Sequence, residues 1–92
     1  MSTAMGRKTA TVPAAMRKAV VARDEHCAYP FCDRPPGWCD AHHIHHWADG
    51  GETKLSNLVL LCRRHHREMH GPRAMTIEMV NGRPRFLWPG ET

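Results

Sequence analysis

The sequence predicts a single small α+β domain, on the basis of three observations. Residues 13–23 carry apolar side chains at helical spacing, residues 75–80 alternate apolar with polar side chains, and an Asn-Gly pair follows them. With 92 residues the chain forms at most one domain, and so short a chain needs disulfides or a bound metal to support its small core. We expect one domain over residues 12–92, after a flexible basic arm at residues 1–11.

The first helix is predicted after Pro13, a residue suited to the first helical turn. Met16, Ala19 and Val20 recur at i, i+3 and i+4, so they form one apolar stripe that faces the core. Arg17 lies off that stripe and faces solvent or a polyanion.

The segment that follows, residues 24–39, reads as a loop because it contains three prolines and a glycine. Within it, Cys27 and Cys32 form one half of a tetrahedral zinc site, or alternatively a disulfide. Cys62 and His65 form a second half-site at Cys-x-x-His spacing. The four residues together predict a structural Cys3His zinc site that joins the two ends of the domain. Cys39 is left over; it could replace one of the four ligands, but we expect it to be a buried strand cysteine.

The middle of the chain is predicted as a strand, a turn, an apolar run and a helix. The strand covers residues 38–47, and the turn lies at Asp49-Gly50-Gly51. The apolar run is residues 57–61, and the helix covers residues 62–70 up to the Gly71-Pro72 pair. A C-terminal hairpin follows over residues 74–88, with its turn at Asn81-Gly82; we expect it to cover the core and assign it no chemistry.

Histidine is concentrated in one stretch, since seven of the eight histidines lie between Cys39 and His70. His66 and His70 are four residues apart, so on a helix they project about 40° from each other on one face. A third ligand is expected from His42 or His43. Three protein ligands with an open position are typical of a catalytic metal site rather than a structural one.

These residues resemble a known family, the HNH endonucleases with their ββα-metal (His-Me finger) fold. The similarity covers residues 23–71 and includes the runs CDAHHI, DGG and NLVLLCRRHH. It is greatest to the compact, zinc-stabilised HNH domains of actinobacterial and phage proteins. The resemblance therefore implies that the α+β domain is a ββα-metal domain with an added N-terminal helix and C-terminal hairpin.

The resemblance also implies a role for each residue of the motif. His42 corresponds to the first metal ligand, and His66 and His70 correspond to the other two. His43 corresponds to the general base that deprotonates the attacking water. Asn57 corresponds to the middle asparagine, which either ties down the loop and orients the base or assists the metal. At the zinc site the chain departs from many relatives, which carry a second cysteine at the position of His65.

The implied activity is metal-dependent hydrolysis of DNA phosphodiester bonds by an endonuclease or nickase. A neutral imidazole is a suitable base at physiological pH, and one divalent cation (Mg2+, Mn2+, Ni2+ or Zn2+) would act as Lewis acid. The expected partner is double-stranded DNA, read with little sequence specificity, and the excess of 13 basic over 9 acidic residues agrees with this. The candidate phosphate contacts are Arg63, Arg64, Arg67 and Arg73.

Two other functions fit parts of the sequence. A zinc-stabilised nucleic-acid-binding module without catalysis would need only the Cys3His residues, and a small secreted disulfide protein would need no metal. No apolar run is long enough for a membrane span or a secretory signal, so we expect a bacterial or phage-infected cytoplasm and no membrane partner. A homodimer or a larger parent protein is left open. His45 and His46 are expected at the surface or in packing, and Trp47 in the core.

Overall fold

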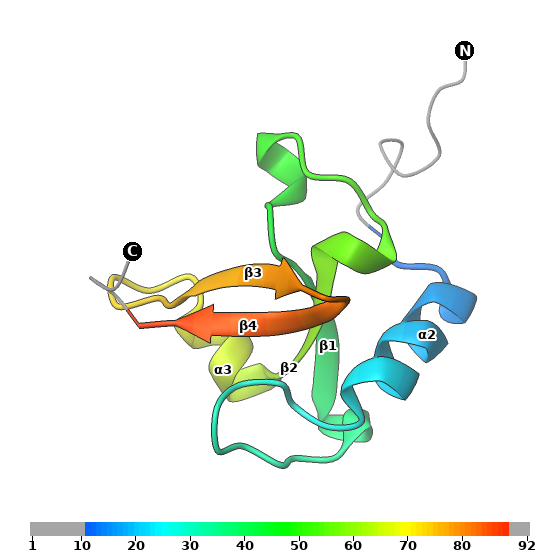
Figure 1. Cartoon of the computed structure of the whole chain (residues 1–92), viewed down its shortest axis with the longest axis horizontal. Helices are drawn as coiled ribbons and strands as arrows, with labels where there is room; N and C mark the ends of the chain where they lie inside the picture. The colour runs from blue at the N-terminus through cyan, green and yellow to red at the C-terminus, as the bar shows by residue number, and fades with distance from the viewer. Residues whose placement is uncertain (1–10, 89–92) are drawn as a thin grey trace.

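The computed structural model describes residues 11–88 and confirms the α+β class (Figure 1). The predicted basic arm lies outside these residues, except for Thr11. Within them no helix is long and apolar enough to cross a membrane. Over residues 11–88 the chain forms two antiparallel two-stranded sheets, two α-helices and three single turns of 3-10 helix. In chain order the helices and strands are α2 (Ala14–Asp24), β1 (Cys39–His43), β2 (Leu58–Cys62), α3 (Arg63–Glu68), β3 (Thr76–Val80) and β4 (Arg83–Leu87).

The centre of the fold is β2, whose five residues are all fully buried. It pairs with β1 in an antiparallel register that sets Cys39 opposite Cys62 and His43 opposite Leu58. The helix α2 covers β2 with its apolar stripe, of which Val20 is fully buried. A strand that is buried on both faces has apolar residues at every position, which explains the uninterrupted run Leu-Val-Leu-Leu at residues 58–61.

The strand predicted over residues 38–47 is shorter, because β1 ends at His43. A loop over residues 44–57 then projects from the sheet (Figure 1). Its turn uses both glycines: Gly50 has a φ of 99°, and a Cβ on Gly51 would lie 1.8 Å from the carbonyl oxygen of His45. The prediction of a turn at this point is therefore confirmed, but the strand leading into it ends four residues early.

The helix predicted over residues 62–70 is also shorter, because α3 covers Arg63–Glu68 with Cys62 as its N-cap residue. Beyond Glu68 the backbone tightens from i−4 to i−3 hydrogen bonds. His70 N donates to Arg67 O at 3.1 Å and Gly71 N donates to Glu68 O at 3.0 Å. Such tightening is common at a helix end, and here the Gly71-Pro72 pair follows it.

The C-terminal hairpin is confirmed, with β3 and β4 joined by Asn81 and Gly82, both at positive φ. The predicted alternation holds, since Ile77 is 8% exposed while Thr76 and Glu78 point to solvent. Phe86 on β4 also packs against the buried core. The hairpin therefore covers the core, as expected.

An ion pair at the end of α2 ties this helix to the central sheet. Arg23 and Asp24 face each other at 2.7 Å, with the Asp24 side chain only 2% exposed. Arg23 donates to the carbonyl oxygens of Leu55 and Leu58, while the Asp24 carboxylate accepts from Leu60 N at 3.0 Å. These bonds hold the single turn Leu55–Asn57 at the start of β2.

Candidate metal centres and active site

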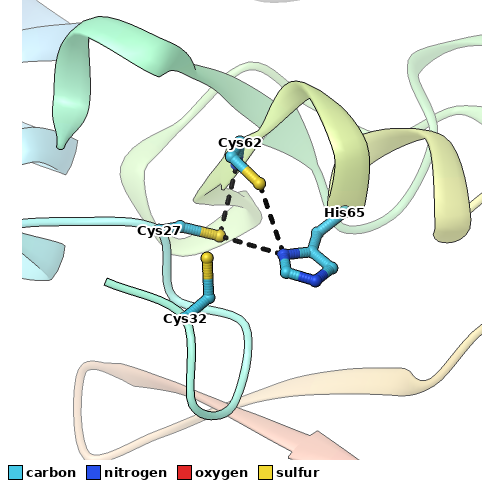
Figure 2. Close-up of side chains that lie close together, drawn as sticks. All are labelled: Cys27, Cys32, Cys62 and His65. Carbon is cyan, nitrogen blue, oxygen red and sulfur yellow. Dashed lines mark hydrogen bonds between the residues drawn. The ribbon is translucent and has the colours of Figure 1, made fainter. Parts of the chain in front are cut away.

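The first metal-binding cluster joins the loop after α2 to the start of α3. Cys27 and Cys32 come from the loop, and Cys62 and His65 come from the β2–α3 junction, with their ligand atoms all within 4.8 Å of one another. Figure 2 shows the sulfurs and the imidazole Nδ1 directed toward a common point. His65 Nδ1 lies 3.6 Å from Cys27 Sγ and 3.3 Å from Cys62 Sγ. Zinc bond lengths place sulfur and nitrogen ligands about 3.6 Å apart in a tetrahedron, so the geometry fits that ion.

The backbone around this cluster explains why it forms. Ala28 N donates to Leu60 O at 2.8 Å, and Cys62 N donates to Cys27 Sγ at 3.3 Å, so the loop is joined to β2. The ring of Tyr29 stacks on His65 with centroids 3.9 Å apart and planes 3° apart. All four cysteines are free thiols, and Cys39 is buried in β1 outside the cluster.

The pKa values of two thiols of this cluster are shifted in opposite directions. Burial raises the pKa of the Cys27 thiol to about 12. Burial also acts to raise the pKa of Cys62, but hydrogen bonds from the His65 backbone N–H and from Cys27 and Cys32 outweigh it, and the pKa is lowered. Of these two thiols, Cys62 is therefore the more easily deprotonated for metal binding, since the thiolate is the ligand form.

A second cluster of three imidazoles lies between β1 and α3. His42 comes from β1, His66 and His70 come from α3 and the turn after it, and their ligand atoms lie within 4.8 Å of one another. The ring centroid of His42 is 4.8 Å from that of His66 and 5.6 Å from that of His70. Burial and the neighbouring histidines lower the pKa of His42 to about 3, so this ring is neutral, as a metal ligand must be.

A fourth histidine, His46, which was expected at the surface or in packing, borders this cluster. Its ring stacks on His70 at 5.1 Å and meets His42 edge to face at 5.6 Å. This contact had no signal in the residue spacing, because it forms only where the chain turns after the end of β1 at His43. His45 is exposed and its side chain stays outside the cluster.

His43 points away from the three-imidazole cluster, as neighbours on a strand do. Its Nε2 forms a 2.8 Å hydrogen bond with the hydroxyl of Thr53, a residue that is 7% exposed. Burial, followed by the charge of His46, lowers the pKa of His43, so the ring is neutral at physiological pH. Thr53 had no signal in the sequence, because only the folded loop brings it to His43.

Asn57 ties down the loop that separates β1 from β2. Its Oδ1 accepts a hydrogen bond from His45 N at 2.8 Å, while its Nδ2 donates to His45 O at 3.0 Å and to Glu52 O at 2.8 Å. The side chain therefore occupies both backbone groups of His45 and holds the two arms of the loop together. Of the two roles that the resemblance implied for Asn57, these contacts match the loop-tethering one.

Replacement of Asn57 by alanine is expected to destabilise the domain by about 2–4 kcal/mol, because buried backbone groups lose their partners. Urea unfolding of the zinc-loaded protein measures this loss. Ser56→Ala is the matched control, because Ser56 is the exposed neighbour in the same turn. Equal stabilities of the two variants would contradict the tethering role.

The four candidate phosphate-binding arginines are all exposed. Arg64 lies 3.9 Å from Glu68 in an i, i+4 ion pair on α3. Arg63, at the first turn of α3, borders a groove that also contains Asp40, and Asp40 lies 3.6 Å from His66 Nδ1. Arg63 is thus placed one helical turn from the three-imidazole cluster.

Residues 25–71 match the family model described as HNH endonuclease, and this segment contains both metal-binding clusters, His43 and Asn57. The chain belongs to the HNH endonuclease family. Domains of this family are generally nucleases that use divalent metals and act on DNA.

Relatives of this HNH domain include proteins of Mycobacterium tuberculosis (strain ATCC 25618 / H37Rv). The uncharacterized protein Rv3776 is 42% identical over 53 residues, which cover 58% of this chain and 10% of that protein. The uncharacterized protein Rv1128c is 36% identical over 52 residues, which cover 56% and 12%. The uncharacterized protein Rv1702cMb1728c is 29% identical over 73 residues, which cover 79% and 16%. The matched segment is thus a small part of each relative. No solved structure matches the chain.

Proposed function

We propose that this HNH domain is a metal-dependent DNA endonuclease or nickase that hydrolyses phosphodiester bonds with one divalent cation. One observation carries the proposal: besides the Cys3His cluster, the domain has a second cluster made only of imidazoles. A non-catalytic zinc module would require the Cys3His cluster alone. His43 stands next to the second cluster in sequence and points away from it, which suits a base that binds no metal.

His43 is proposed to take the proton of the attacking water. Its hydrogen bond to Thr53 Oγ1 fixes the orientation of the ring through Nε2, so Nδ1 is the atom assigned to the proton. A side-chain partner on the second nitrogen is the usual way to orient a catalytic or metal-bound imidazole. The lowered pKa keeps His43 in the unprotonated form that a base requires.

His42, His66 and His70 are proposed to hold the cation, which when bound supplies a Lewis acid beside the scissile phosphate. Three imidazole ligands favour Zn2+ or Ni2+ over Mg2+, which prefers oxygen ligands. His46 lies beside this donor set, with its ring against those of His42 and His70. Cys27, Cys32, Cys62 and His65 are proposed to hold a structural Zn2+.

The variant His42→Ala separates the two sites. We expect the protein to keep one zinc per chain in the Cys3His cluster while its affinity for a second cation falls at least about 100-fold, since a ligand is lost. Calorimetric titration of the zinc-loaded protein with Ni2+ measures the affinity, and cleavage of a DNA duplex is followed in parallel. His45→Ala, a neighbouring exposed histidine, is the control and should match wild type. Undiminished cleavage by His42→Ala would contradict the assignment.

A further inference from the structure

A groove of about 280 Å³ runs alongside the three-imidazole cluster, at the seam between β1 and α3. Trp38, Asp40 and Arg63 line it, together with Gly37 and Cys39. It lies at the opposite end of β1 from the loop that carries Thr53. Neither the zinc cluster nor the proposed base uses it.

The groove and the three-imidazole cluster share the same two elements. Asp40 and His42 are two residues apart on β1, so they project from one face about 7 Å apart. Arg63 and His66 are three residues apart on α3, so they also share a face. The 3.6 Å contact between Asp40 and His66 joins the groove to the cluster. A DNA strand with one phosphate at the cluster would therefore place its neighbouring nucleotide in this groove.

Trp38 gives the groove a flat aromatic wall that the fold does not bury. Its side chain is 64% exposed, although tryptophan gains much from burial. The guanidinium of Arg34 lies 5.6 Å from the centroid of its ring, and Arg63 lines the same groove. An exposed aromatic ring with cationic side chains nearby is an arrangement with which proteins bind single-stranded nucleic acid, since the ring stacks on a base and the cations contact phosphates.

We propose that this groove is a nucleotide subsite, in which an unpaired DNA base stacks on Trp38 and its phosphate contacts Arg63. The proposal rests on the proposed nuclease function, because it assigns the groove to the nucleotide next to the scissile phosphate. Asp40 also lines the groove, and its carboxylate lies 3.6 Å from His66 Nδ1, so we assign the phosphate to the Arg63 side of the groove. The substrate preference that follows is for DNA with unpaired or easily unstacked nucleotides beside the cleavage point.

The test measures DNA affinity in a His43→Ala background, so that the zinc-loaded protein does not cleave its ligand. The probe is a single-stranded oligonucleotide with 2-aminopurine, whose fluorescence falls on stacking. Trp38→Ala is expected to raise the Kd about tenfold and to remove the fluorescence change. Trp88→Ala, which alters a tryptophan that is 50% exposed beyond β4, should leave both unchanged. Zinc content and melting temperature verify that each variant is folded.

The second pair of variants tests the contact between Arg63 and the phosphate. Arg63→Ala should weaken binding and reduce its salt dependence, while Arg85→Ala, an exposed arginine on the hairpin, should not. A blunt duplex, whose bases are already stacked, should lose less affinity than the single strand on Trp38→Ala. Equal losses on the two DNA forms, or equal affinities of the Trp38→Ala and Trp88→Ala proteins, would overturn the subsite. Failure of the nuclease proposal gives a different result, namely no cleavage by the protein with His43 intact.

Discussion

The Cys62→Ala variant is expected to lose cooperative folding and its bound zinc. Cys62 is fully buried, belongs to the Cys3His cluster and is the N-cap residue of α3. A structural zinc supplies about 10–16 kcal/mol of apparent binding free energy, and a domain of this size has about 5–15 kcal/mol of net stability. Loss of the ion therefore removes as much free energy as the fold has. Circular dichroism against temperature, with zinc analysis of the purified protein, measures both effects.

The structure offers a close control for this variant. Cys39 is also buried, at 4% exposure, and it pairs directly with Cys62 across the sheet, but it lies outside the cluster. Cys39→Ala removes one buried sulfur and should cost only about 1 kcal/mol, with a cooperative transition and one zinc retained. A folded, zinc-containing Cys62→Ala protein, or equal losses in the two variants, would contradict the assignment of the zinc site.

The His43→Ala variant is expected to stay folded and to lose cleavage by about 10²- to 10⁴-fold, the usual contribution of a general base. His43 is only half-buried, and its single side-chain bond is to Thr53, so the core does not depend on it. Single-turnover cleavage of a DNA duplex, with melting temperature measured alongside, separates the two effects.

The control for His43 is His26→Ala, because His26 is exposed and lies outside both metal-binding clusters. This variant should cleave at the wild-type rate. A large drop in the melting temperature of His43→Ala would instead show a structural histidine. Retention of the wild-type cleavage rate would exclude His43 as the base.

Half of each metal-ligand set could be predicted from local spacing. Cys62 and His65 lie on one helical turn, and His66 and His70 lie four residues apart, so each pair is brought together by its own segment. The approach of Cys27, Cys32 and His42 to these pairs depends on tertiary packing, and the sequence indicated it only through the Cys-x4-Cys spacing and the resemblance to the family. The end of α3 was predicted less accurately, because the tightening of the backbone after Glu68 depends on hydrogen bonds within the turn at Gly71.

The contacts made by the loop over residues 44–57 could not be predicted from the spacing of residues in the sequence. Its path depends on Asn57 bonding to His45, on the close approach of Gly51 to the His45 carbonyl, and on the end of β1 at His43. These long-range contacts bring Thr53 to the base, a pairing that no residue spacing encodes. The groove beside Trp38 likewise exists only because α3 packs along β1.

Plasmid nicking tests the central claim most directly. The zinc-loaded protein and its His43→Ala variant are incubated with supercoiled plasmid and Mg2+, Mn2+, Ni2+ or Zn2+ in turn. We predict that wild type converts the plasmid to the nicked or linear form with at least one of these ions, and that His43→Ala leaves it supercoiled. Equally intact plasmid with both proteins under all four ions would contradict the account of this domain as a nuclease.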